Sequence, residues 1–173
     1  PPPKPVIQLK GVAMKSATQI DMPGAIDFQT GSAKILMNDS SKKVLGQITT
    51  ILKDNPSITS LSIEGNTDNA GENKGFDNTK LSQERAQSVV DYIVKQGVDK
   101  SRLAAVGNGS KNPLAPNDTP DHMAVNRRVE FHVRGYNGQP VASDASSAPA
   151  AAASPAPAAA PASSSAKTPP KKP

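Results

Sequence analysis

Two side chains of opposite charge, Asp68 and Arg85, could together bind a charged ligand. Asp68 lies in a loop rich in glycine, asparagine and aspartate that follows a predicted strand. We expect Arg85 in the first turn of the next helix, because Ser82 is a suitable N-cap. There the free backbone N–H groups and the helix dipole would favour a carboxylate. The planar guanidinium group can also donate two parallel hydrogen bonds to it. Arg85 is therefore a candidate carboxylate-binding residue.

Both candidates also have an ordinary structural interpretation. On spacing alone, Asp68 could form a turn hydrogen bond within its loop. Arg85 could be a solvated helix residue that pairs with Glu84 or Asp91. Spacing does not decide between these interpretations and a binding site.

Other polar residues are further candidates for a binding or metal site. Arg127 and Arg128 precede a strand, whose alternation places them on opposite faces, and we expect Arg127 rather than Arg128 to address the pocket. Thr30, in the turn after another predicted strand, is a candidate for the pocket rim. His122 and His132 have no metal-ligand spacing and no cysteine to assist them, so we expect both at the surface and predict no metal or cofactor.

Apolar periodicity and cap residues predict the elements that position these side chains. The first helix follows possible N-caps at Asp39, Ser40 and Ser41 and stops at Asn55 and Pro56, and Gly97 fits the end of the second. The predicted strands are residues 6–14, 25–28, 57–65, 102–107 and 126–134, and the helices are residues 42–54 and 82–96. This order predicts an α+β fold, with two main helices packed on one face of a mixed sheet of about four strands.

Composition divides the chain into three parts and narrows the class of protein. Residues 1–19 form a proline-rich lead and possible edge strand, residues 20–134 a domain, and residues 135–173 a Pro/Ala/Ser-rich tail that we expect to be disordered. The net charge is +5, but aromatic residues make up only 3% and do not alternate with basic runs, which argues against nucleic acid. No apolar run reaches the length of about 20 residues that a membrane helix needs, so we expect any membrane attachment outside this chain.

Five segments in order resemble the OmpA-like domain family, which includes the C-terminal domain of OmpA and the MotB and Pal types. They are AIDFQTGSAKI (25–35), IEGNTDNAG (63–71), NTKLSQERA (78–86), RLAAVGNGSKNP (102–113) and NRRVEF (126–131). The resemblance covers about residues 20–134 and implies an OmpA-like two-layer sandwich. The chain departs from the family pattern twice: Asn66 stands where histidine is usual, and the loop between Gly71 and Asn78 is about two residues longer.

The resemblance implies non-covalent binding of peptidoglycan through the diaminopimelate of the peptide stem. Asp68 would bind its ammonium group and Arg85 its carboxylate. Further contacts would come from Asn78, the backbone around Thr67 and Leu81, and Arg127.

The expected role is an anchor in the Gram-negative periplasm that links the outer membrane or an envelope assembly to the cell wall. It is not enzymatic, since no catalytic constellation is visible in the sequence. The alternative is an OmpA-like domain that serves mainly as a protein–protein module, with other envelope proteins as its partners.

Overall fold

The computed structural model describes residues 7–141 of the 173-residue chain. The predicted disordered tail lies outside the described residues from residue 142 on, so it stays a prediction there. In chain order the elements are α1 (Asp39–Asp54), β1 (Ile58–Asn66), η1 (Glu72–Lys74), α2 (Asn78–Lys95), η2 (Lys100–Arg102), β2 (Leu103–Gly109), α3 (Pro120–Asn126), β3 (Arg128–Tyr136) and β4 (Gln139–Pro140). No helix among the described residues is long and apolar enough to cross a bilayer.

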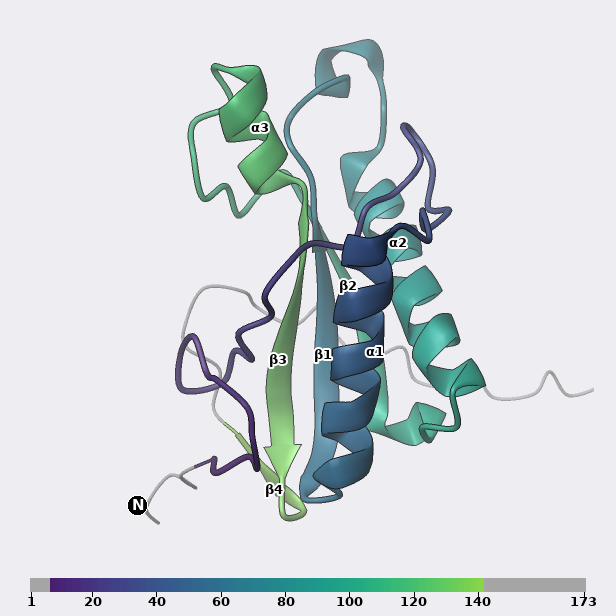
Figure 1. Cartoon of the computed structure of the whole chain (residues 1–173). Coiled ribbons are helices and arrows are strands. Elements are labelled where there is room, and N and C mark those ends of the chain that lie inside the picture. The colour runs from purple at the N-terminus through teal and green to yellow at the C-terminus, as the bar shows by residue number, and fades with distance from the viewer. Residues whose placement is uncertain (1–6, 142–173) are drawn as a thin grey trace, which may run out of the picture.

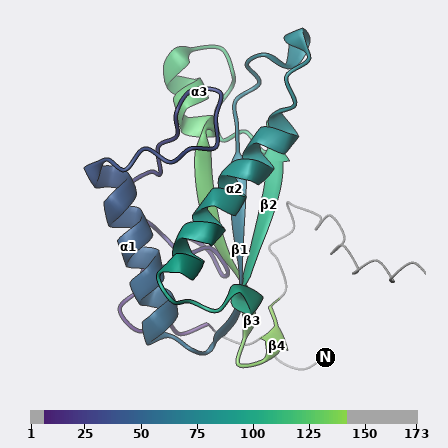
Figure 2. The same ribbon diagram turned by 90° about the vertical axis from the view of Figure 1, so that its right-hand side faces the viewer.

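Four strands form one mixed sheet in the order β2-β1-β3-β4. β1 pairs in parallel with β2 and antiparallel with β3, and β4 pairs antiparallel with β3. The helices α1 and α2 cover the same face of this sheet (Figures 1 and 2). The prediction of an α+β fold with two main helices on a mixed four-stranded sheet is therefore confirmed.

The two main helices bury the apolar stripes that the sequence shows. In α1, the residues Val44, Leu45, Ile48 and Leu52 are buried, and in α2 the buried residues include Ala86, Val89, Val90 and Ile93. These side chains form one core with the inward residues of β1 and β3. The cap of α1 is Asn38, whose side chain accepts from Ser41 N at 2.8 Å, so the predicted caps lie one to three residues too far along the chain.

The start of α2 differs from the prediction and changes the setting of Arg85. The helix begins at Asn78, because the Asp77 side chain caps it by accepting from Lys80 N at 2.9 Å. Ser82 lies inside the helix, buried, and its hydroxyl accepts from Gly109 N of β2 at 2.9 Å. Arg85 is about two turns into the helix, so its predicted place in the first turn is wrong. The predicted end is confirmed, since Gly97 has a left-handed φ of 94°.

Two glycines let α2 approach the sheet closely. A Cβ atom on Gly65 of β1 would overlap the carbonyl oxygen of Ser82. A Cβ atom on Gly107 of β2 would lie 2.5 Å from Gln83 N. The first turns of α2 therefore rest directly on the backbone of β1 and β2, which fixes the helix relative to the end of β1.

The N-terminal segment lies along the sheet without forming the predicted strands. Residues 6–14 and 25–28 contain no strand among the residues described. The described part of the chain before α1 has only the isolated bridges Met14–Ile20, Gln19–His132 and Phe28–Ile35. Thr18 O accepts from Val133 N at 2.8 Å, and Ile20 N donates to Phe131 O at 2.9 Å. Residues 18–20 therefore protect the outer edge of β3, which periodicity within the segment could not reveal.

The short elements α3 and β4 were not predicted, nor were the turns of 3-10 helix η1 and η2. α3 occupies a proline-rich segment that reads as a loop, yet Thr119 caps it and Pro120 takes the first position, where proline is favoured. β3 continues to Tyr136, and β4 pairs with it through a turn at Asn137 and Gly138. The boundary predicted after Arg134 is thus wrong by several residues, since the ordered domain extends to these strands.

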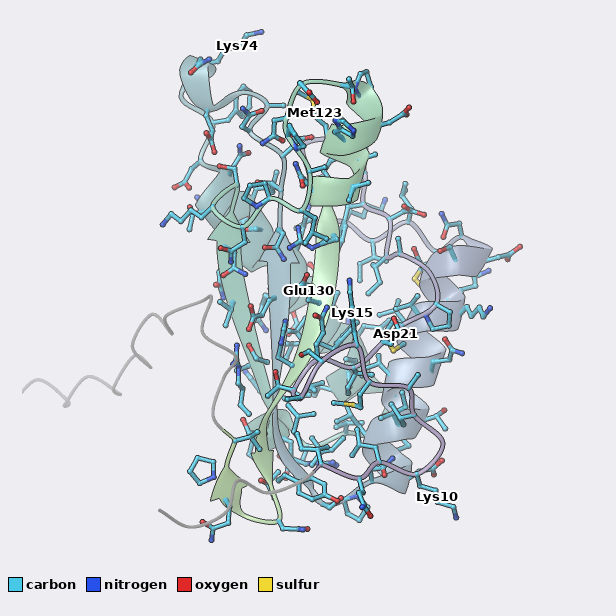
Figure 3. All side chains as sticks on the ribbon, turned by 90° about the vertical axis from the view of Figure 1, so that its left-hand side faces the viewer. Lys10, Lys15, Asp21, Lys74, Met123 and Glu130 are labelled. Carbon is cyan, nitrogen blue, oxygen red and sulfur yellow. The ribbon has the colours of Figure 1, made fainter. Side chains whose placement is uncertain are left out.

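A polar network lies on the sheet face opposite the main helices. Arg134 contacts Glu64 at 2.5 Å, Arg128 contacts Glu130 at 2.7 Å, and His132 Nε2 lies 3.0 Å from the other oxygen of Glu130. Figure 3 shows Glu130 on this face. His132 is half-buried rather than at the surface as predicted. Although Glu64, Glu130 and His132 lie close enough to share a cation, both carboxylates already have guanidinium partners, so we interpret the cluster as structural.

This network predicts a loss of stability in acid. Burial raises the pKa of Glu130. Hydrogen bonds from His132 and Arg128 and the charges of both have a larger, opposite effect, so that the pKa falls from an ordinary 4.5 to about 2. The stabilisation is complete above pH 4.5 and is lost as the pH falls towards 2. Between pH 6 and pH 2.5 the free energy of unfolding should drop by about 2 to 3 kcal/mol from this group alone. Denaturant titrations at both pH values should show a smaller drop for Glu130→Gln, and an equal drop would contradict the assignment.

The free edge of β2 is occupied by a side chain of α2. Gln83 Nε2 donates to Ala105 O at 2.9 Å, and Gln83 Oε1 accepts from Gly107 N at 2.7 Å. Gln83 thus binds one backbone donor and one backbone acceptor of an edge strand.

Candidate functional site

A cleft of about 770 Å³ lies at the end of the sheet where β1 ends. Its walls are the turn around Gly31, the loop from Thr67 to Asp77, the first turns of α2 and the residue that follows α3. The structure brings all seven residues predicted from the sequence into this cleft: Thr30, Thr67, Asp68, Asn78, Leu81, Arg85 and Arg127.

Asp68 is held in place by backbone contacts just beyond β1. Thr67 N donates to Gly109 O at 2.9 Å, which extends the pairing of β1 with β2 by one residue. One oxygen of Asp68 accepts from Ala70 N at 2.9 Å. The other oxygen accepts from Arg127 Nη1 at 2.5 Å. The Asp68 side chain is only 10% exposed, so its carboxylate is fixed and faces a cation across the cleft.

Arg85 reaches the same cleft from α2. Its Nε donates to Ser32 O at 3.0 Å, and its Cζ lies 5.1 Å from the ring centre of Phe28. Burial lowers the pKa of Arg85, the charge of Asp68 raises it, and Arg127 lowers it again, with a net lowering. Arginine still remains protonated at neutral pH, because its ordinary pKa is so high. The turn around Gly31 and the aromatic ring therefore position a charged guanidinium group near Asp68.

Asn78 and Thr67 complete the inner wall. Asn78 Nδ2 lies 3.2 Å from both Asp68 O and Ala70 O, so this side chain closes the loop that carries Asp68. Thr67 is 3% exposed, and its hydroxyl has no hydrogen-bond partner among the described residues. A buried hydroxyl without a partner is unusual in a folded protein.

Arg127 and Arg128 diverge as alternation predicted. Arg127 lines the cleft, contacts Asp68 and leaves 46% of its side chain exposed. Arg128 points to the other sheet face and contacts Glu130 and the carbonyl oxygen of Asn112. Of these two arginines, only Arg127 is placed to meet a ligand in the cleft.

Several lining residues were missed from the sequence. Phe28 lies beside Arg85, and Lys80 and Glu84 line the cleft from α2 with their charged groups 4.0 Å apart. Lys74 and Phe76 line it from the loop before α2. The extra length of that loop was the one feature of the sequence that pointed to a change in the cleft wall. It did not show which side chains would line the cleft.

The arrangement suits a ligand with a positive and a negative group on one carbon. A fixed carboxylate offers a partner for an ammonium group, and two guanidinium groups beside it offer partners for a carboxylate. Because Asp68 already contacts Arg127, an ammonium group must share Asp68 with Arg127 or displace it. Arg85 has no carboxylate partner within ion-pair distance among the described residues, so it is the more available cation.

Comparison with known proteins agrees with this architecture. Residues 27–127 match the family model described as OmpA family. The probable lipoprotein YiaD of Escherichia coli is 38% identical over 65% of this chain and 49% of its own length. The peptidoglycan-binding protein ArfA of Mycobacterium tuberculosis is 40% identical over 65% of this chain and 36% of its own length. This chain thus spans about half or less of the length of these relatives.

The crystal structure of the peptidoglycan-associated lipoprotein from Burkholderia pseudomallei superposes with a TM-score of 0.55 and 28% identity, covering 64% of this chain and 89% of the other. From the family match and the shared fold, we conclude that this chain belongs to the OmpA family.

Proposed function

We propose that this domain binds peptidoglycan non-covalently in the cell envelope by holding the diaminopimelate of a stem peptide in the cleft. The observation that carries the proposal is the meeting of Asp68, Arg85 and Arg127 in one cleft. Asp68 binds the ammonium group, and Arg85 binds the carboxylate on the same carbon. The similarity to the peptidoglycan-binding protein ArfA supports peptidoglycan as the polymer that is bound.

The inner wall supplies further contacts for this ligand. Thr67 lines the cleft beside Asp68, and Asn78 holds the loop that presents Asp68. Leu81 and Thr30 line the same space. The role is retention on the wall without turnover.

The expected affinity for one stem is low. A hydrogen bond to a charged group contributes about 1.5 to 3 kcal/mol. Asp68 and Arg85 together therefore give about 3 to 6 kcal/mol, which corresponds to dissociation constants near the millimolar range. Firm attachment follows when several tethered copies act on one polymeric wall. Weak single contacts combined with multivalent attachment suit an anchor, because each contact can exchange while the assembly stays attached.

Co-sedimentation with purified sacculi tests the proposal. The 173-residue chain should sediment with diaminopimelate-containing sacculi, and free diaminopimelate should release it. Pimelate keeps both carboxylates without the amines, and 1,7-diaminoheptane keeps two amines without the carboxylates. Neither should release the chain, because the cleft needs both charges on one carbon.

Two results would count against this function. One is a chain that stays in the supernatant with sacculi, which would favour a protein–protein module instead. The other is release by pimelate as efficient as release by diaminopimelate, because that would show binding of carboxylates without any role for Asp68.

A further inference from the structure

The loop between Gly71 and Asn78 forms an ordered wall of the cleft. The backbone N–H groups of Lys74 and Phe76 both donate to Gly71 O, at 2.9 and 3.1 Å. At its base, Glu72 accepts from the Ser110 hydroxyl and lies 3.4 Å from Asn78 Nδ2. The extra length of this loop, noted from the sequence, is thus folded into a closed turn.

This turn presents an aromatic ring to the cleft. Phe76 lines the cleft and is 67% exposed, the largest exposed fraction among the large hydrophobic residues described as exposed. Its ring rests on Gly71, where a Cβ atom would lie only 2.8 Å from Phe76 Cδ2. Since Gly71 has a φ of 80°, glycine is favoured there on both counts. The ring is therefore held in position by the loop while one side stays open to a ligand.

A cation accompanies the ring. Lys74 lines the same cleft and makes no ion pair in the part of the chain that the structure describes. Figure 3 shows Lys74 at the outer tip of the loop. Lys80 has Glu84 within 4.0 Å, so Lys74 is the more available cation on this wall.

The cleft is larger than the zwitterionic end of one amino acid requires. Its volume of about 770 Å³ lies in the upper part of the range for drug-sized ligands, about 300 to 1,000 Å³. Asp68 and Arg85 account for one charged end of the ligand only. The wall made by Phe76 and Lys74 therefore has room for the next residue of the same peptide.

We propose that Phe76 and Lys74 form a second subsite, which binds the alanine that follows diaminopimelate in a stem peptide. Its methyl group packs on the Phe76 ring, and its terminal carboxylate lies near the Lys74 ammonium group. This inference rests on the proposed function, because Asp68 and Arg85 must hold the diaminopimelate first. The subsite makes the domain prefer stems that still carry the terminal alanine.

Calorimetric titration of the full chain with three ligands tests the subsite. The ligands are free diaminopimelate, a tripeptide that ends in diaminopimelate, and the tetrapeptide extended by alanine. Wild type should bind the tetrapeptide about fourfold more tightly than the tripeptide, the effect expected for burying one methyl group. Phe76→Ala should abolish this difference and leave the affinities for diaminopimelate and tripeptide unchanged. Phe76→Leu, which keeps an apolar surface, should retain most of the preference.

The contribution of Lys74 is separable from that of the ring. Lys74→Gln should lower affinity for the tetrapeptide by about twofold at low salt, because exposed charges interact weakly and are screened. A tetrapeptide with an amidated terminus should bind wild type and Lys74→Gln equally.

Three outcomes would overturn the inference. Equal weakening of all three ligands by Phe76→Ala would show that the ring only shapes the cleft. No weakening of any ligand would show that the ring makes no contact. If wild type bound none of the ligands, the proposed function would fail and the subsite with it, whereas normal binding of diaminopimelate without a tetrapeptide effect would reject the subsite alone.

Discussion

Replacing Arg85 with alanine should abolish retention of the chain on isolated sacculi while leaving the domain folded. Arg85 is a cleft cation without a carboxylate partner among the described residues, and its contacts with Ser32 O and Phe28 hold it in position for a ligand carboxylate. Loss of a hydrogen bond to a charged group weakens binding by about 10- to 100-fold. From a starting affinity near the millimolar range, this loss takes the complex below detection in co-sedimentation.

Two further variants make the result specific. Arg85→Lys keeps the charge but loses the planar fork, so retention should fall without disappearing. Lys95→Ala removes a positive charge from the last turn of the same helix, outside the cleft, and should sediment like wild type. Circular dichroism and thermal unfolding establish that Arg85→Ala is folded. A folded Arg85→Ala chain that sediments like wild type would remove the basis of the proposed site.

Substitution of Gly65 by alanine should strongly destabilise the domain, and the same change should abolish ligand binding in the cleft. A Cβ atom at this position of β1 overlaps the backbone carbonyl of Ser82, and backbone cannot rotate away as a flexible side chain can. Forcing extra atoms into a packed interior costs about 1 to 3 kcal/mol, and we expect the upper end of this range because α2 must move as a unit. Since α2 carries Arg85 and β1 leads to Asp68, the shift also separates the two charged groups.

Gly46 of α1 provides the matched control. It is exposed, and a Cβ atom there meets nothing within 4 Å. Gly46→Ala should therefore raise the free energy of unfolding by about 0.5 to 1 kcal/mol, because alanine favours the helix. Urea titrations measure both effects. A Gly65→Ala domain as stable as wild type would show that the contact between α2 and β1 is looser than the structure indicates.

Features that depend on neighbouring residues in the chain were predictable from the sequence. The apolar stripe of α2 and the left-handed Gly97 come from local spacing and backbone sterics, and both match the structure. Arg127 and Arg128 diverge as the sequence predicted, although Arg127 lies between α3 and β3 rather than in the strand. The ordered motifs located the cleft residues, although their roles in binding stay predictions.

Features that depend on distant contacts were not predictable. Asp77 and Ser82 are both good N-cap residues. In the structure Asp77 caps the helix, while the Ser82 hydroxyl accepts from Gly109 N of β2, a contact that local sequence does not show. The ion pair of Asp68 with Arg127 joins residues 59 positions apart. His132 was expected at the surface because it has no metal-ligand spacing and no cysteine to assist it. In the structure His132 and Glu130 are half-buried beside Glu64 of β1.

The two hydrogen bonds of Gln83 with the edge of β2 affect whether copies of this domain associate at high local density. An uncovered strand edge exposes backbone donors and acceptors that can recruit another sheet and lead to aggregation. With Ala105 O and Gly107 N already engaged by Gln83, an incoming strand would have to break two hydrogen bonds before forming its own. Crowded copies of this domain can thus remain separate units.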